Sequence, residues 1–301
     1  MTTPKYIVRL AAASGLAVLI AGCGSESSPE AATPAPVETA EPQTQTAATN
    51  EQAAEPDQSL TAAGLRISVW DGNDVGGGRL EMSKDGEVVY NVTGERFELG
   101  GPGPSEGRVG LGEDITGDGI PNLVVELWTG GTVCCVDYLV YELAGDGPEL
   151  LGRVSAQTGG RFEDFDNDGA YEIRIHDATF LGWNAGVEDS PAPPVVLRWD
   201  GLWYAPDAEL MRAPAPTPVQ LANWTELVES GEEWDRPGEF APPAQLWGVA
   251  LDLIYTGHPN LGMAFMESAW RADIEGREAF IASFLSKLNE SEHYRAISRG
   301  Q

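Results

Sequence analysis

An internal repeat of acidic loops is the feature that most constrains the fold of this chain. The first copy reads Asp114-Ile-Thr-Gly-Asp-Gly-Ile-Pro-Asn-Leu123, and the second, 50 residues later, reads Asp164-Phe-Asp-Asn-Asp-Gly-Ala-Tyr-Glu-Ile173. A strand–turn–strand pattern follows each copy, at 137–154 and at 195–204, and a third such pattern at 79–92 precedes the first copy without a clear acidic loop. A period of this length is typical of folds that repeat one supersecondary unit.

The segment 61–214 predicts a β domain that carries both acidic loops. Short runs of β-branched and aromatic residues alternate there with turns rich in glycine and aspartate. Lys84-Asp85-Gly86 and Asp200-Gly201 are good hairpin turns. The expected strands are 65–70, 79–83, 87–92, 122–128, 133–143, 149–155, 171–176, 195–199 and 202–204.

The segment 215–301 predicts a small helical domain. Thr217 and Gln220 fit a capping box, with Pro218 at the first helical position. Two apolar stripes follow at helical spacing, 246–254 and 280–288, and four helices are expected near 217–229, 243–256, 260–271 and 274–289. The fold class is therefore α+β, in which a β-rich, propeller-like or meander domain precedes a C-terminal helical domain.

The second acidic loop carries the strongest chemical signal, because its carboxylates alternate along the chain. Asp164, Asp166 and Asp168 occupy positions 1, 3 and 5, and Glu172 occupies position 9. Calcium takes six to eight hard oxygen ligands around a tight turn, and the carbonyl of Ala170 at position 7 is a further candidate ligand. Position 12 lies within an expected strand, so this loop is not an EF-hand.

The first loop offers fewer charged ligands in the same pattern. Its candidate ligands are Asp114, Thr116, Asp118 and Asn122, so it has two carboxylates where the second loop has four. Fewer charged ligands predict weaker calcium binding. The alternative for both loops is an aspartate-rich turn in which the carboxylates accept hydrogen bonds from backbone N–H groups.

The loop pattern D-x-D-x-D-G-x-x-[DE], running into a strand, resembles the FG-GAP/VCBS repeats of integrin-α-type β-propellers. The resemblance covers 114–206 and implies a calcium-braced, non-enzymatic binding module. The run Thr129-Gly-Gly-Thr-Val-Cys-Cys135 also resembles uncharacterised bacterial exported proteins in which a Gly-Gly-x-x-Cys-Cys strand follows an aspartate loop. Closed propellers have four to eight blades, so an irregular propeller fragment, a curved meander and a sandwich all remain open for three such units.

The adjacent cysteines Cys134 and Cys135 leave two states open. Exported proteins favour disulfides, but a bond between neighbouring residues requires a distorted backbone that interrupts a strand. The other state is a pair of reduced thiols. No C-x-x-C motif is present to indicate a redox role.

The N-terminus resembles that of bacterial lipoproteins. Lys5 and Arg9 precede an apolar core at 10–20, and Leu19-Ile-Ala-Gly-Cys23 follows as a lipobox. The resemblance implies that residues 1–22 form a signal peptide and that lipid on Cys23 anchors the protein to the membrane. Gly24 in place of aspartate points to the outer membrane of the cell envelope.

The composition predicts a disordered segment between the anchor and the folded part, and it argues against nucleic acid as a partner. Residues 23–60 are rich in Ala, Pro, Thr, Glu and Gln and predict a disordered tether. The chain contains 47 acidic and 18 basic residues, and removal of 1–22 would take its formal net charge from −29 to −31. Nucleic-acid binding needs basic patches, so it is not expected.

Two functions compete on these observations. The first is a non-enzymatic binding or assembly role in the cell envelope, with an envelope protein or a glycan as partner. The alternative is a secreted-type hydrolase that acts on polysaccharide or cell-wall material. The first is favoured because no nucleophile–base motif stands out: Ser105 sits in a literal G-x-S-x-G within a Gly/Pro-rich loop, and the three histidines have no zinc spacing.

Overall fold

The computed structural model describes residues 55–72, 77–131, 135–145, 147–235 and 242–299. These residues belong to one compact unit, Ala53–Gln301. Within the described ranges, no helix combines the length and the apolar character needed to cross a membrane. The expected signal peptide, Cys23 and Cys134 lie outside the described residues.

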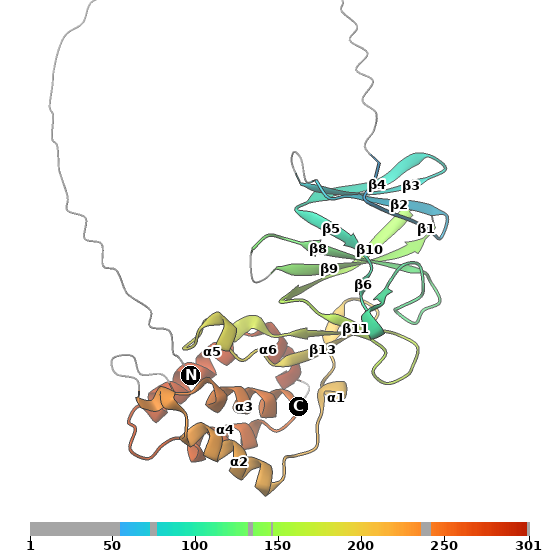
Figure 1. Ribbon diagram of the computed structural model, residues 1–301. Helices are drawn as coiled ribbons and strands as arrows, with labels where there is room; N and C mark the ends of the chain where they lie inside the picture. The colour runs from blue at the N-terminus through green and yellow to red at the C-terminus, as the bar shows by residue number, and fades with distance from the viewer. Residues whose placement is uncertain (1–54, 73–76, 132–134, 146, 236–241, 300–301) are drawn as a thin grey trace, which may run out of the picture. The chain divides into compact units, whose positions relative to one another are not determined.

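Three antiparallel sheets of four strands follow one another along the chain, each with its strands in sequence order (Figure 1). The first sheet contains β1 (Gln58–Ala62), β2 (Leu65–Trp70), β3 (Gly78–Lys84) and β4 (Glu87–Gly94). The second contains β5 (Arg96–Leu99), β8 (Asn122–Trp128), β9 (Val136–Ala144) and β10 (Gly147–Gln157). The third contains β11 (Arg161–Glu163), β12 (Glu172–His176), β13 (Pro194–Trp199) and β14 (Tyr204–Pro206). A small separate hairpin of β6 (Gly101–Pro102) and β7 (Arg108–Val109) lies in the chain between β5 and β8, which pair directly with each other.

None of the three sheets in the described ranges closes on itself, each having an edge strand on either side, and the expected propeller-like arrangement of the sheets is not confirmed. Most of the expected strands are present, and two of them, Leu65–Trp70 and Asn122–Trp128, have the expected bounds. The hairpin turn at Asp85 is confirmed, since Asp85 and Gly86 both have positive φ between β3 and β4.

Several expected boundaries are wrong. The helix expected at 260–271 ends at Ser268, and the helix expected at 274–289 begins at Arg277. Three further differences precede the helices. The tether was expected to reach residue 60, but β1 begins at Gln58, because the Ala63-Gly64 turn folds this segment back onto β2 and Leu60 packs against the core. The strand expected from 133 begins at Val136. The strand expected at 202–204 is β14, which begins only at Tyr204, because the Asp200 carboxylate accepts hydrogen bonds from the N–H groups of Leu202 and Trp203 and holds both in the turn.

The second sheet is buried on both faces, which explains the nearly continuous apolar run of its central strands. Leu123 and Val125 of β8 pack with Ile67 and Leu80 of the first sheet. Val124, on the opposite face of β8, belongs to a separate cluster that includes the third sheet and the helices. The sheets thus form successive layers with a hydrophobic cluster on each side of the second one.

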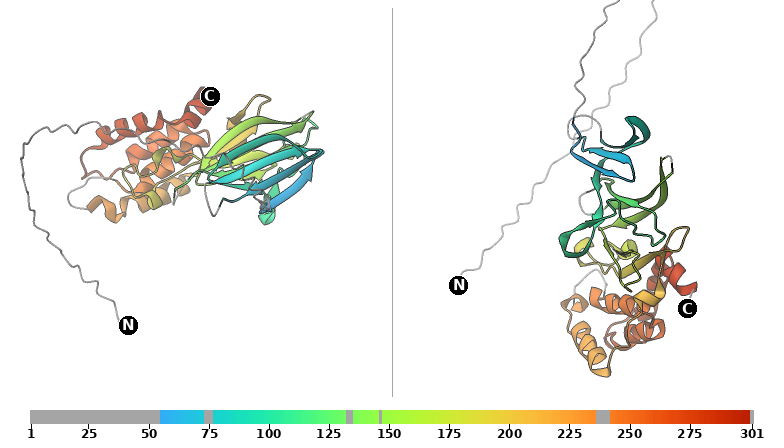
Figure 2. Two further views of the ribbon diagram at one scale, coloured as in Figure 1. Left: turned by 90° about the horizontal axis from the view of Figure 1, so that it is seen from above. Right: turned by 90° about the vertical axis from the view of Figure 1, so that its right-hand side faces the viewer.

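The helices follow the third sheet in the chain and lie together on one side of the row of sheets (Figure 2). They are α1 (Ala208–Met211), α2 (Pro218–Glu229), α3 (Ala244–Tyr255), α4 (Pro259–Ser268), α5 (Arg277–Leu288) and α6 (Glu292–Arg299). The capping box at the start of α2 is confirmed, since Thr217 and Gln220 exchange side-chain to backbone hydrogen bonds. The short helix α1 and the helix α6 were not expected.

The helices and the third sheet share one hydrophobic core. Trp247 of α3 is fully buried, with its ring centroid 5.4 Å from that of Phe180 and 5.2 Å from that of Trp183. Phe180 and Trp183 belong to the connection between β12 and β13, and Phe284 of α5 packs against both. Trp183 is therefore part of the aromatic core.

A buried carboxylate adds a polar contact between the same parts. Asp177 directly follows β12 and is 3% exposed. It accepts hydrogen bonds from the hydroxyls of Tyr255 of α3, at 2.6 Å, and of Ser291, just before α6. It also accepts a bond from the N–H of Thr179 at 2.9 Å.

Candidate metal centre

The two acidic loops occupy equivalent places in successive sheets. Loop 1, residues 114–122, leads into β8, and loop 2, residues 164–172, joins β11 to β12. Each loop therefore precedes the second strand of its sheet. The loops also touch, because the N–H of Tyr171 in loop 2 donates to the carbonyl of Ile115 in loop 1 at 2.8 Å.

Both loops are closed by the same hydrogen bond between position 2 and position 9. In loop 1 the N–H of Ile115 donates to the side-chain oxygen of Asn122 at 2.8 Å. In loop 2 the N–H of Phe165 donates to the carboxylate of Glu172 at 3.0 Å. Asn122 and Glu172 are both fully buried, so each supplies an acceptor that the folded loop cannot obtain from water.

The aspartates at positions 1 and 5 also bind backbone N–H groups. Asp114 accepts from Gly119 at 2.7 Å, and Asp164 accepts from Gly169 at 3.1 Å. Asp168 accepts from the N–H of Ala170 at 2.8 Å. These bonds have the form of aspartate turns, so the loops have an internal hydrogen-bond network that does not require a metal.

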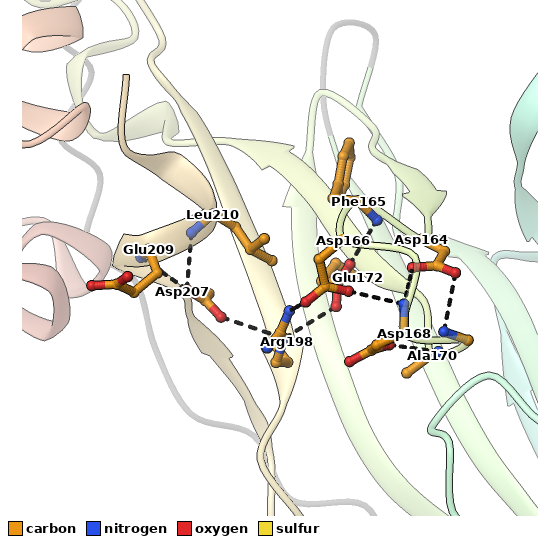
Figure 3. A network of polar contacts seen from close by, with 11 residues as sticks. Asp164, Phe165, Asp166, Asp168, Ala170, Glu172, Arg198, Asp207, Glu209 and Leu210 are labelled. Atoms are coloured by element: carbon orange, nitrogen blue, oxygen red, sulfur yellow. Dashed lines mark hydrogen bonds and ion pairs between the residues drawn. The ribbon is translucent and has the colours of Figure 1, made fainter. Parts of the chain in front are cut away.

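Loop 2 brings three of its four predicted carboxylates together. One oxygen each from Asp164, Asp166 and Glu172 lies within 4.8 Å of the others (Figure 3). Asp168 is not part of this group. Among the described residues, loop 1 has no comparable group of three.

A guanidinium group that the loop motif does not predict lies against the loop 2 carboxylates. Nη2 of Arg198, on β13, forms an ion pair with Asp166, and its Nε lies 3.1 Å from Oε1 of Glu172. The same Nε lies 3.3 Å from Oδ2 of Asp207 (Figure 3). The signal that could have found Arg198 is strand register, since its neighbour Leu197 pairs with Ile173 beside Glu172.

Burial dominates the electrostatics of Glu172. Desolvation raises the pKa of its carboxyl, although the Phe165 N–H and Arg198 act in the opposite direction, and Asp166 adds to the rise. A buried carboxylate of raised pKa is one whose charge is incompletely neutralised by its surroundings. Additional positive charge at this position would stabilise its ionised form.

Loop 1 differs from loop 2 in the residue of the adjacent strand that lies beside position 9. Asn122 pairs with Glu142 of β9, so a third carboxylate, in addition to Asp114 and Asp118, lies beside this loop where loop 2 has an arginine. Burial, and then the negative charges of Asp118 and Glu149, raise the pKa of Glu142. Glu142 lies outside the acidic motif in the chain, so the motif does not predict its position beside loop 1.

Comparison with protein-family models, curated proteins and solved structures finds no match. The function therefore has to be argued from the chemistry of the site.

Three other residues considered from the sequence, Cys135, Ser105 and His258, lie outside the two acidic loops. Cys135 is disulfide-bonded and has φ 111°, a left-handed conformation that is strained for a non-glycine residue, between the end of β8 and the start of β9. Ser105 lies in a single 3₁₀ turn between β6 and β7, not in a strand-to-helix turn. Nε2 of His258 is 2.8 Å from the carbonyl oxygen of Ala213, a structural contact.

Proposed function

We propose that this protein is a calcium-braced lipoprotein of the cell envelope with a non-enzymatic binding or assembly role. The single observation that carries the calcium part is the convergence of Asp164, Asp166 and Glu172 within 4.8 Å in loop 2. Three carboxylates at that separation repel one another unless positive charge lies among them. The protein supplies only part of that charge, through Arg198.

The donor set of loop 2 fits calcium better than other common metals. Its groups are hard carboxylate oxygens, and no histidine or cysteine belongs to the cluster. Asp164, Asp166 and Glu172 would hold the ion, and the carbonyl of Ala170 and water would complete its coordination. Bound calcium would supply positive charge that braces the loop against the start of β12.

Loop 1 is the weaker of the two proposed sites. Asp114, Thr116, Asp118 and Asn122 would contribute ligands there. Asn122 carries no charge, and its oxygen already accepts two hydrogen bonds from Thr116 and one from Ile115. Fewer charges and an occupied acceptor both predict a higher Kd than at loop 2.

Calcium is expected to raise the melting temperature of the full chain. For a Kd of about 10⁻³ M, typical of extracellular calcium modules, about 10 mM calcium stabilises the folded state by about 1.4 kcal/mol. That corresponds to a shift of about 3–5 °C for a domain of this size. Differential scanning fluorimetry with and without calcium measures the shift.

Two variants that each remove one negative charge make the test specific. Asp166→Asn removes a carboxylate of the cluster and is expected to abolish most of the shift. Glu226→Gln, on the exposed face of α2, is expected to keep the full shift. Equal shifts in both variants would mean that calcium acts on the whole acidic surface and not on loop 2.

The relationship to FG-GAP/VCBS repeats is part of this proposal. It is supported by the position of each loop before the second strand of a four-stranded meander, and by the repetition of that arrangement in consecutive sheets. We propose that the three sheets are blade-like units of an open array, and that the first sheet lacks the acidic loop because the tight Ala63-Gly64 turn takes its place.

The anchor is proposed from the lipobox that ends at Cys23. Cys23→Ser is expected to move the protein from the membrane fraction to the soluble fraction, because several acyl chains hold a protein stably and none would remain. Fractionation followed by immunoblotting measures the change. A Cys23→Ser variant that stays with the membrane would contradict lipid anchoring at this residue.

The binding role is supported by an apolar tip that solvent reaches. Leu202 and Trp203 lie in the turn between β13 and β14, and they are 74% and 61% exposed. Exposed large apolar side chains that are neighbours in a turn can form part of a contact site for a partner. The proposed partners are an envelope protein or a glycan.

A further inference from the structure

We propose that Arg198 is a built-in competitor for the calcium ion of loop 2, and that calcium displaces its guanidinium from Asp166 and Glu172 onto Asp207. This inference rests on the proposed calcium site and adds the residue that sets its affinity.

The contacts of Arg198 overlap with the proposed ligands of the ion. Its Nη2 pairs with Asp166 and its Nε lies 3.1 Å from Glu172, so it neutralises two of the three clustered carboxylates (Figure 3). A divalent cation among the same oxygens would lie within a few Å of the guanidinium, and the two positive charges would repel each other strongly in so confined a site. Calcium and this arrangement of Arg198 therefore exclude each other.

The fold fixes the backbone of Arg198 and leaves the end of its side chain partly exposed to solvent. Its backbone is fixed by the pairing of Leu197 with Ile173 on one side and of Arg198 with Ala205 on the other. Its cross-strand neighbour on β14 is the small side chain of Ala205. The side chain of Arg198 is 35% exposed, so the guanidinium can swing without disturbing the core.

Asp207 offers the displaced guanidinium another partner. Its Oδ2 already lies 3.3 Å from Nε of Arg198. Its Oδ1 caps α1 by accepting hydrogen bonds from the N–H groups of Glu209 and Leu210, at 2.9 and 3.1 Å. The carboxylate of Asp207 is thus held in place by the start of α1, and an Arg198 that leaves loop 2 keeps an ion pair.

Loop 1 provides an internal comparison. The residue that pairs there across the strands with position 9 is Glu142, a carboxylate, whereas Arg198 lies beside position 9 of loop 2. The loop with more carboxylates therefore faces a positive side chain, and the loop with fewer faces a negative one. This difference between the two loops indicates that Arg198 compensates the negative charge of loop 2 when calcium is absent.

The test is a calcium titration of the purified full chain by isothermal titration calorimetry. Arg198→Gln removes the positive charge and is expected to lower the Kd of loop 2 about tenfold. Arg198→Lys keeps the charge and is expected to stay within about threefold of the unmodified protein. Asp207→Asn removes the alternative partner and is expected to raise the Kd about threefold. Asp166→Asn identifies which binding event belongs to loop 2.

The titration results distinguish a failure of the competitor role of Arg198 from a failure of the proposed calcium site. If the unmodified chain binds calcium at loop 2 and Arg198→Gln binds with the same Kd, the competitor role is wrong and the calcium site stands. If neither protein binds calcium, both proposals fail. Circular dichroism checks the fold of each variant. Should Arg198→Gln not fold, Asp207→Asn decides the question, because an unchanged Kd in that variant contradicts displacement onto Asp207.

Discussion

Replacing Asp177 by alanine is expected to lower the free energy of unfolding by about 3–5 kcal/mol. The substitution removes a buried acceptor and leaves the hydroxyls of Tyr255 and Ser291 and the N–H of Thr179 without it. These donors come from three separate segments, so the loss loosens the third sheet from α3 and α6. Urea denaturation followed by circular dichroism measures the change.

Matched variants separate the hydrogen bonds from the carboxylate. Tyr255→Phe and Ser291→Ala each remove one donor and are expected to cost about 1–2 kcal/mol, less than the loss of the shared acceptor. Asp273→Ala removes an exposed carboxylate of the same type and is expected to leave the free energy of unfolding close to that of the unmodified protein. A cost below about 1 kcal/mol for Asp177→Ala would contradict a structural role for this carboxylate.

The carboxyl group of Asp177 also predicts how the free energy of unfolding changes at acidic pH. Burial alone would raise the pKa of Asp177, but the hydrogen bonds from Ser291, Thr179 and Tyr255 outweigh it and hold the pKa below the ordinary value of 3.8. A lowered pKa in the folded state contributes stability that is fully present above the unfolded-state pKa and is lost as the pH falls through the folded-state pKa. Asp177→Asn is therefore expected to flatten the loss of stability below pH 3.8.

Replacing Trp247 by alanine is expected to cost about 3–5 kcal/mol, because it opens a large cavity in the core that the helices share with the third sheet. Trp247 is fully buried and contacts Phe180 and Trp183 of the β12–β13 connection. A shared core further predicts that the third sheet and the helices unfold together. Denaturation followed both by tryptophan fluorescence and by far-ultraviolet circular dichroism tests this.

Trp203 provides the control for this prediction. It is 61% exposed in the β13–β14 turn, so Trp203→Ala removes the same side chain without leaving a cavity and is expected to cost less than about 1 kcal/mol. Equal costs for Trp247→Ala and Trp203→Ala would contradict the core. Two well-separated transitions in the unmodified protein would show that the helical segment is an independent domain.

Features that depend on neighbours in the chain could be predicted from the sequence. The strand at Leu65–Trp70 and the capping box at Thr217 are such features, because a period of two or an offset of three residues identifies them. The acidic loops belong to the same class. Alternating aspartates before a glycine specify a tight turn through local hydrogen bonds, which do not depend on distant parts of the chain.

Features that depend on the pairing of distant segments could not be predicted in this way. Arg198 lies 32 residues after Asp166 in the chain, and only the register of β12 with β13 brings the two together. Ser291 reaches Asp177 across 114 residues. The strand β1 was missed for a related reason, since its composition is that of the preceding tether and only its pairing with β2 makes it a strand.

A structure determined in millimolar calcium shows whether the carboxylates of loop 2 converge on a calcium ion. We expect an ion 2.3–2.6 Å from oxygens of Asp164, Asp166 and Glu172, with the guanidinium of Arg198 on Asp207. A calcium-soaked structure in which Arg198 still bridges Asp166 and Glu172, with no ion between the carboxylates, would contradict it.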